Sequence, residues 1–405
     1  MISRTERQKI CINKWLNSGH NTIQACTGFG KTRVALMLIN SLLKVNSDIS
    51  VLIIVPTEVL KNQWLNKLDE WQLLNNCTVE IVNSAIKKEW TCNLLVIDEI
   101  HLMASHTFSQ IFETVEYQMI LGLTATLERL DGKEILIKKF APVCDTITLD
   151  EAKRMGWVSP IKEYAVLLDV DLTNYNKLNQ KFNGYFAFFD WNFAIAMQAC
   201  QNWKFRNAYA KQLGVTPKEV MGIAMGWMRC MNERKKFIRS HPKKIEICKK
   251  ILAARKDKKC ITFSATIKDA ESLKIGEVLH SKKSKKKNAE ILEKFNNIES
   301  GVLCTSKAAD QGVDIKGLSV GIIMSIDSSK IRKTQRVGRI IRFEEGKTAE
   351  LFTLILRDTQ EWKWFQNSNI SDTIVIDEYQ LDDILNGKEV ITRTRDQIED
   401  IKYRF

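Results

Sequence analysis

Two short apolar runs limit the possible folds of this chain more than any other feature. They are Val51–Val55, which ends at Pro56, and residues 94–97, which Asp98 follows directly. Runs that are rich in β-branched residues and lack polar alternation are typical of strands buried on both faces of a parallel sheet. Residues 120–123 are a third candidate strand, and helical patterns occupy the stretches between the strands. The sequence therefore predicts an α/β domain with a doubly wound parallel sheet.

The second half of the chain shows the same alternation of strand and helix patterns. Candidate strands lie at 259–263, 301–304, 319–324 and 351–356, while residues 170–240 are rich in aromatic residues and helix formers. We therefore predict two parallel-sheet α/β domains in tandem with a helical insertion between them. The expected limits are 1–168 for the first domain, 169–240 for the insertion and 241–405 for the second domain.

Residues 25–32 read Ala-Cys-Thr-Gly-Phe-Gly-Lys-Thr between a short strand pattern and a helix pattern. Glycines in such a loop let backbone N–H groups turn inward around phosphates, and the helix N-terminus adds its dipole. Lys31 would reach the β- and γ-phosphates of a nucleotide, and the Thr32 hydroxyl would ligate Mg²⁺. The alternative is a glycine-containing turn in an unrelated α/β protein. The predicted nucleotide-binding residues of this loop are Thr27, Gly28, Gly30, Lys31 and Thr32.

An acidic pair, Asp98 and Glu99, follows the strand at 94–97, and His101 comes two residues later. A carboxylate at the C-terminal end of a parallel strand lies in the crevice where ligands bind. Asp98 would hold the nucleotide and Mg²⁺, and Glu99 would orient and deprotonate the attacking water. By itself such a pair is common on protein surfaces. Its position after the loop that contains Lys31 favours phosphate chemistry with ATP.

These segments together resemble superfamily 2 helicases, and the resemblance extends over most of the chain. The loop at 25–32 is similar to the first motif of that family, in which alanine is usual in place of the first glycine. Residues 98–101 match the DExH form of its second motif. Residues 56–64 resemble motif Ia, which holds the nucleic-acid backbone in the family. Pro56 and Thr57 are therefore predicted contacts of nucleic acid.

The resemblance continues toward the C-terminus. Residues 124–126 resemble motif III, 261–264 stand where motif IV belongs, 305–315 look like motif V, and 335–342 match Q-R-x-G-R-x-x-R, which is motif VI. Guanidinium groups on one domain that reach phosphates on another make hydrolysis depend on domain closure. The alternative for motif VI is a basic helix face in solvent. The resemblance implies that Gln335, Arg339 and Arg342 act on the nucleotide, that Gly312 and Asp314 couple to it, and that Thr305 contacts nucleic acid.

Residues 121–132 resemble the XPB-like branch of the superfamily, which includes phage branch-migration helicases. In that branch both α/β domains are RecA-like, and the insertion at 169–240 corresponds to a thumb-like element. The family's R-x-x-Q pattern before the first motif is only partly present, because Gln8 fits loosely and Thr5 stands where arginine is expected.

Positive charge is concentrated in one region of this chain, whose formal net charge is +13. Between Arg229 and Lys287 there are 20 Lys or Arg residues against 6 Asp or Glu residues. Neutralising phosphates with such side chains releases counterions, so we expect the main nucleic-acid surface here. A solvated helix face is the alternative. The predicted contacts are Lys282, Lys283, Lys285, Lys286 and Lys287. For the aromatic residues at 182–205 we favour a small helical core over base stacking.

The leading prediction is an ATP- and Mg²⁺-dependent DNA helicase or translocase that acts on single-stranded, forked or branched DNA. The alternatives are an RNA helicase or RNA-stimulated ATPase, the motor subunit of a nuclease or restriction assembly, and a non-enzymatic scaffold. We expect a monomeric cytoplasmic protein, with replication or recombination proteins as further partners. The ten cysteines lack C-x-x-C spacing, which favours a reducing compartment. No apolar run reaches the roughly 20 residues of a membrane span, so no membrane partner is expected.

Overall fold

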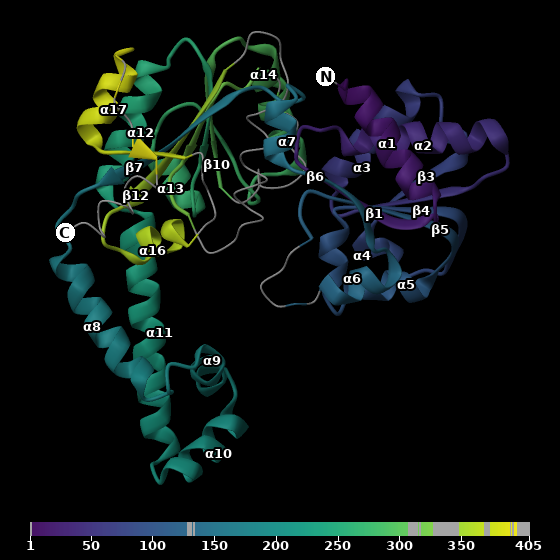
Figure 1. Ribbon diagram of the computed structural model, residues 1–405. Coiled ribbons are helices and arrows are strands. Elements are labelled where there is room, and N and C mark those ends of the chain that lie inside the picture. The colour runs from purple at the N-terminus through teal and green to yellow at the C-terminus, as the bar shows by residue number, and fades with distance from the viewer. Residues whose placement is uncertain are drawn as a thin grey trace.

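The computed structural model describes residues 2–127, 132, 134–306, 315, 317–326, 348–367, 373–388, 390 and 393–394. Within these residues the chain forms two α/β parts, each built on its own sheet, and a long helical arm projects from the second part (Figure 1). The predicted fold class, two RecA-like parallel-sheet domains with a helical insertion, is confirmed.

The first part contains strands β1 (His20–Ala25), β2 (Val51–Val55), β3 (Cys77–Ile81), β4 (Trp90–Asp98), β5 (Val115–Thr124) and β6 (Val143–Ile147). Its helices are α1 (Arg4–Leu16), α2 (Lys31–Val45), α3 (Glu58–Glu70), α4 (Val82–Ala85), α5 (Ile111–Thr114), α6 (Glu134–Phe140) and α7 (Leu149–Arg154). The strand order is β3-β2-β4-β5-β1-β6, and all paired strands are parallel.

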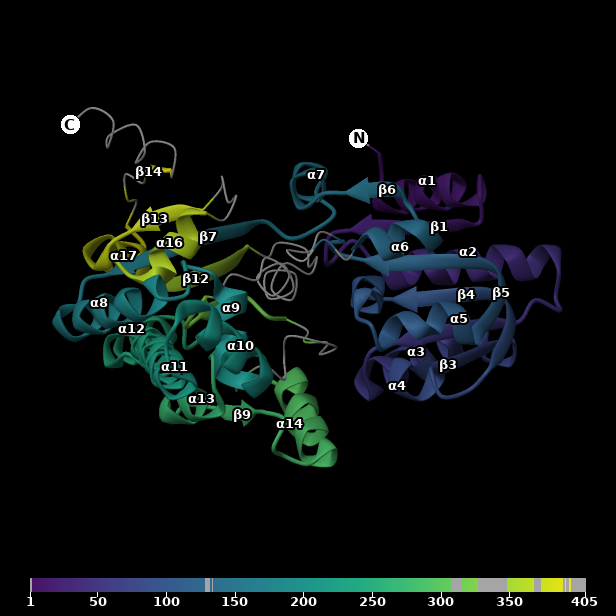
Figure 2. The same cartoon turned by 90° about the horizontal axis from the view of Figure 1, so that it is seen from below.

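Alternate side chains of these strands enter two separate cores, as the pleat of a strand requires. Ile53 and Val96 pack with helices α1, α2 and α3 on one face of the sheet. Ile54 and Ile97 pack with α5 and α6 on the other face. Figure 1 shows these two helical layers on either side of the first sheet, and Figure 2 shows the strands of that sheet side by side. Burial on both faces explains why β2 and residues 94–97 of β4 carry no polar alternation.

The second part contains β7 (Ile161–Leu168), β8 (Lys259–Phe263), β9 (Glu277–Leu279), β10 (Gly301–Thr305), β11 (Val320–Ile323), β12 (Ala349–Leu356), β13 (Ile374–Ile376) and β14 (Arg393–Thr394). Its helices are α12 (Pro242–Ala254), α13 (Ile267–Ser272), α14 (Lys285–Asn297), α16 (Gln360–Gln366) and α17 (Glu378–Leu385). The strand order is β14-β13-β7-β12-β11-β8-β10-β9, and only the short β14 runs antiparallel to its neighbour in the described sheet.

Strand β7 corrects the domain limit expected at residue 168. All eight of its residues pair in parallel with β12, from Ala349↔Ile161 to Leu356↔Leu168. The strand therefore belongs to the second sheet, and the helical insertion begins after the first strand of that sheet. The sequence did not reveal this because β7 is an apolar strand that would fit either sheet. We propose that the second domain begins at β7.

The arm, which we define as residues 173–239, consists of α8 (Thr173–Ala187), α9 (Phe193–Gln201), α10 (Trp203–Leu213) and α11 (Pro217–Arg239). Thr216 and Glu219 form a capping box at the start of α11, and Pro217 occupies its first turn, where a missing N–H costs nothing. Phe189 and Trp227 are fully buried where the four helices meet. The favoured prediction of a small helical core is thus confirmed for most of the arm's aromatic residues.

Candidate nucleotide-binding site

The glycine-containing loop lies between β1 and α2, as the sequence predicted. Gly30 is the N-cap of α2 and has a φ of +96°, and Gly28 has a φ of +89°. A Cβ atom on Gly30 would lie 2.8 Å from Gln8 Nε2 and 3.0 Å from Arg4 Nη2. Glycine is therefore required at position 30 by its backbone conformation and also by the lack of space.

Two side chains of α1 hold this loop in place. Arg4 donates hydrogen bonds to the carbonyl oxygens of Gly28 (2.7 Å) and Phe29 (2.8 Å), and Gln8 donates to that of Phe29 (2.9 Å). Gln8 is fully buried, and its amide oxygen accepts a bond from Arg33. The arginine that accompanies Gln8 is therefore Arg4, one helical turn earlier. The R-x-x-Q pattern places the arginine at residue 5, where threonine stands, but residues four apart also share a helix face.

Strand register brings the loop and the acidic pair to one edge of the first sheet. In β5, Thr124 pairs with Gln24 of β1, and Leu123 pairs with Asp98 of β4. The strands β1 and β4 flank β5, so at a spacing of about 4.8 Å per strand they lie roughly 10 Å apart. The loop at 25–32 and Asp98 therefore face the same crevice at the carboxyl edge, where parallel α/β sheets bind ligands.

Asp98 is buried and held by two donors. Its Oδ2 accepts a hydrogen bond from Trp64 Nε1 at 2.9 Å, and its Oδ1 accepts one from the Glu99 N–H at 3.0 Å. Burial, reinforced by the neighbouring Glu99 charge, raises the pKa of Asp98 to about 6, while the Trp64 bond and the Lys31 charge oppose this rise. Trp64 was predicted only as part of motif Ia. The structure gives its indole a second role as a donor to Asp98.

Glu99 has a φ of +53°, a left-handed conformation that non-glycine residues rarely adopt. His101 Nδ1 lies 3.3 Å from Glu99 Oε2 and 3.0 Å from Thr124 Oγ1. The single hydroxyl proton of Thr124 goes to the Thr126 carbonyl oxygen at 2.7 Å. Nδ1 of His101 is thus the donor to Thr124, and this histidine links Glu99 to the segment predicted as motif III.

The donor set suits a Mg²⁺–nucleotide complex. Mg²⁺ prefers oxygen ligands and is usually held by one or two carboxylates together with substrate phosphates. The Asp98 carboxylate, whose pKa is raised by burial and by the Glu99 charge, would gain from a nearby dication. In this structure the Lys31 ammonium donates to the Ala25 carbonyl oxygen at 3.2 Å, at the base of the loop. We propose that Thr32 and Asp98 hold the metal and that Thr27, Gly28, Gly30 and Lys31 hold the phosphates.

The predicted nucleic-acid contacts have different surroundings. Thr57 caps α3, and its Oγ1 accepts from the Leu60 N–H at 3.4 Å, next to the half-buried Pro56. Thr305, by contrast, is fully buried and its hydroxyl donates to the Thr262 carbonyl oxygen at 2.7 Å. This burial corrects the prediction for Thr305. Its side chain is enclosed between β10 and β8, so it is not accessible to a nucleic-acid strand.

The lysines at the start of α14 differ from one another as well. The Lys283 ammonium donates to the Val278 carbonyl oxygen at 2.6 Å, so it stabilises its own loop. Lys282, Lys286 and Lys287 are exposed, while the side chain of Lys285 lies outside the described residues. The remaining predicted nucleotide ligands, Gly312, Asp314, Gln335, Arg339 and Arg342, also lie outside the described residues.

The fold and this site define a class of protein: a nucleoside-triphosphate-hydrolysing enzyme whose RecA-like sheet carries a glycine-containing loop and an acidic pair at one edge. The family described as type III restriction enzyme, res subunit, matches residues 2–93 and 72–129. The helicase conserved C-terminal domain matches residues 243–344.

Individual relatives agree with these matches. The DNA 3'-5' translocase XPB2 of Sulfurisphaera tokodaii is 26% identical over 384 residues, which is 89% of this chain and 83% of that protein. The XPB subunit of transcription and DNA repair factor IIH from Danio rerio is 23% identical over 289 residues, 68% of this chain and 30% of that protein. The putative ATP-dependent RNA helicase QP509L of African swine fever virus is 33% identical over 138 residues, 27% of this chain and 26% of that protein.

Solved structures support the fold. The Hef helicase domain of Pyrococcus furiosus aligns with a TM-score of 0.54 at 14% identity, over 91% of this chain and 100% of that one. Dbp5 of S. cerevisiae, bound to RNA and ADP BeF3, aligns with a TM-score of 0.59 at 14% identity, over 94% and 91%. The two family matches and the XPB relatives, rather than these structures, identify the chain as an ATP-hydrolysing superfamily 2 helicase of the XPB-like branch. Among the described residues, no helix is long and apolar enough to cross a membrane.

Proposed function

We propose that the protein is an ATP-dependent DNA translocase or helicase that remodels forked or branched DNA. The observation that carries this proposal is the shared sheet edge, where the Lys31 loop and the buried Asp98 lie roughly two strand spacings apart. Similarity to XPB2, whose name states DNA translocation, supports DNA as the substrate.

In the proposed reaction, Glu99 orients and deprotonates the water that attacks the γ-phosphate, and its Oε2 lies 3.3 Å from His101 Nδ1. Mg²⁺, when bound, neutralises charge that develops on the phosphate oxygens. Lys31 moves from the Ala25 carbonyl oxygen to the β- and γ-phosphates. We propose that Arg339 and Arg342 reach the γ-phosphate from the second domain, with Gln335, Gly312 and Asp314 contributing to the same site, so that turnover requires the two domains to close.

Helix α3 offers a route between nucleic acid and nucleotide. Its N-terminus is at Thr57, where we propose a backbone phosphate contact, and two turns later Trp64 donates to Asp98. A shift of α3 on binding DNA would therefore move a donor of the metal-binding carboxylate. We propose Lys282, Lys286 and Lys287 as further phosphate contacts and leave Lys283 out, because its ammonium already has a partner.

An ATPase assay with single-stranded DNA, blunt duplex, forked DNA, four-way junctions and RNA tests this function. We expect strongest stimulation by forks or junctions, loss of turnover in Lys31→Ala, and retained ATP binding without hydrolysis in Glu99→Gln. Arg339→Ala should lose turnover and keep DNA affinity, whereas normal hydrolysis would contradict the two-domain site. Stimulation by RNA alone would replace the proposal with the RNA-helicase alternative.

A further inference from the structure

Three aromatic rings at the end of the arm are exposed, unlike every other tryptophan and phenylalanine of the described residues. Trp191, Phe193 and Trp203, which we call the tip rings, keep 57%, 55% and 63% of their surface accessible. All ten tryptophans lie in the described part of the chain, and the remaining eight are buried or half-buried. Exposure of three large apolar side chains within a short stretch of chain, residues 191–203, points to a binding surface.

The tip rings are supported from behind by the core of the arm. Trp191 meets Phe186 edge-on with ring centroids 5.5 Å apart, and Phe193 meets Trp227 edge-on at 5.4 Å. Trp227 is fully buried. Because Trp191 and Phe193 each rest against a ring of the arm's core, little of their side-chain freedom is lost when a ligand stacks on them.

The backbone that presents these rings is strained. Asp190 and Trp191 have φ angles of +49° and +57°, so two consecutive non-glycine residues occupy the left-handed region. Asn192 and Asn202 then cap α9 and α10, each accepting bonds from two backbone N–H groups. Such strain persists where the surrounding structure enforces it, and it often marks a functional site. Here it turns the Trp191 side chain outward at the start of α9.

The charge of the arm favours a polyanion over a protein partner. Residues 173–239 contain 11 Lys or Arg residues against 3 Asp or Glu residues. Lys204 lies next to Trp203 in the sequence, and its ammonium is 5.9 Å from the Trp203 ring centre. Aromatic rings beside cations are the elements with which proteins bind single-stranded nucleic acid, because every base has a face that can stack.

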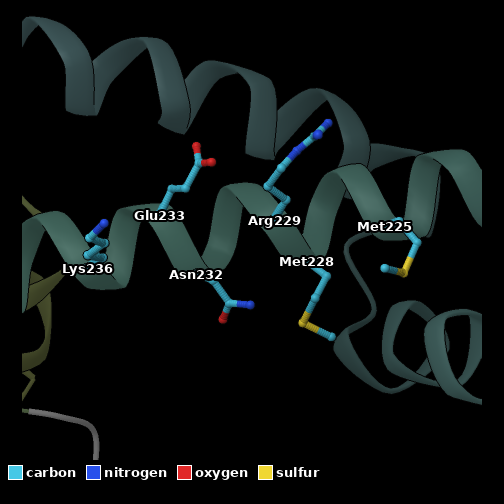
Figure 3. A pocket seen from close by; sticks show the side chains of 6 residues that line it. All are labelled: Met225, Met228, Arg229, Asn232, Glu233 and Lys236. Carbon is cyan, nitrogen blue, oxygen red and sulfur yellow. The ribbon is translucent and has the colours of Figure 1, made fainter. Parts of the chain in front are cut away.

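A hollow on α11 supplies further cations on the same arm. Its volume is about 350 Å³, and it is lined by Met225, Met228, Arg229, Asn232, Glu233 and Lys236. Figure 3 shows Arg229 and Glu233 pointing to one side of α11 and Met228 and Asn232 to the other. The residues that line the hollow thus include two cations, one carboxylate and two methionines, which suits a sugar–phosphate backbone with its mixed charge and apolar surface.

We propose that the tip rings form a stacking platform for the unpaired bases of a single-stranded segment next to a duplex. This rests on the proposed function, since it makes the arm the part of the motor that holds the displaced or unwound strand. The neighbouring cations, Lys204 first, neutralise the phosphates of the stacked nucleotides.

The test measures binding of nucleotide-free protein to a labelled oligo-dT strand and to a blunt duplex, across a range of salt concentrations. Trp191→Ala, Phe193→Ala and Trp203→Ala should each weaken single-strand binding by roughly tenfold, the loss expected for one stacked base. Their slope of log affinity against log salt should not change, since no charge is removed. Lys204→Gln should instead lower that slope by about one. Blunt-duplex binding should be unaffected by the three ring variants.

Tyr379→Ala is the matched control, because Tyr379 is 84% exposed on α17, outside the arm. Trp203→Ala guards against misfolding, since the only ring interaction described for Trp203 is with Lys204. Single-strand binding equal to wild type in all three ring variants would overturn the proposal and leave a protein partner for the rings. Equal losses on single strand and blunt duplex would also overturn it, because they would show contacts that do not depend on unpaired bases. Binding needs no ATP, so failure of the platform is distinguishable from failure of the motor, which appears as absent ATP turnover on every nucleic acid.

Discussion

Trp64→Phe isolates one hydrogen bond to the proposed metal-binding carboxylate. The substitution keeps an aromatic ring in a site that is 1% exposed but removes the indole N–H that lies 2.9 Å from Asp98 Oδ2. Hydrogen bonds to charged groups contribute about 1.5–3 kcal/mol, and one pKa unit corresponds to about 1.4 kcal/mol. We therefore expect the pKa of Asp98, now about 6, to rise by roughly one unit.

The consequence is a magnesium requirement that depends on pH. Only the ionised carboxylate binds Mg²⁺, so protonation of Asp98 raises the half-saturating Mg²⁺ concentration as the pH falls through the pKa. For a rise of one unit from about 6, the variant should need roughly fivefold more Mg²⁺ than wild type at pH 6. The ratio should fall to about twofold at pH 7 and to near equality at pH 8.

The assay is a Mg²⁺ titration of fluorescent ADP binding at these three pH values, with ATP turnover measured in parallel. Trp90→Phe is the matched control, because Trp90 lies at the other end of β4 and donates to the Ala85 carbonyl oxygen. The measured quantity is the half-saturating Mg²⁺ concentration of Trp64→Phe divided by that of wild type. A ratio that is the same at all three pH values, or that equals one at pH 6, would refute the assignment of Trp64 as a donor that lowers the pKa of Asp98.

Three further predictions follow from single contacts. Gly30→Ala should abolish nucleotide binding, measured by calorimetry, because a Cβ at a φ of +96° would lie 2.8 Å from Gln8 Nε2; binding within twofold of wild type would contradict the steric argument. Lys244→Met should destabilise the protein by about 3–5 kcal/mol in denaturant unfolding, since it leaves the fully buried Glu361 carboxylate without its countercharge, and adding Glu361→Gln should restore much of this loss. Without Mg²⁺, the free energy of unfolding of the wild type should decrease between about pH 4 and pH 6 relative to that of Asp98→Asn. The reason is that Asp98, with a pKa of about 6 in the folded state, binds its proton more tightly there than in the unfolded chain. Parallel curves of unfolding free energy against pH for the two proteins would contradict this.

Local sequence was sufficient to predict those features that depend on a single strand or loop. The apolar runs that became β2 and β4 are buried on both faces, so their composition alone identifies them as central parallel strands. The loop before α2 needs glycine at a positive φ, and Asp98 follows a strand whose end faces the crevice. Edge strands were missed: β3 and β6 mix polar and apolar residues because one side of each lacks a neighbouring strand.

Contacts between distant residues were decided only by the tertiary structure. Strand β7 could have joined either sheet, and its pairing with β12, about 190 residues away, placed it in the second. The same holds for the Trp64 bond to Asp98, for Arg4 and Gln8 on the phosphate loop, and for the burial of Thr305. Composition and periodicity indicate the secondary structure in which a residue lies. Hydrogen bonds between residues 20 or more positions apart in the sequence depend instead on how the helices pack on the sheets. The sequence therefore determined the class of the protein and the main residues of its chemistry, and packing determined how those residues are held and tuned.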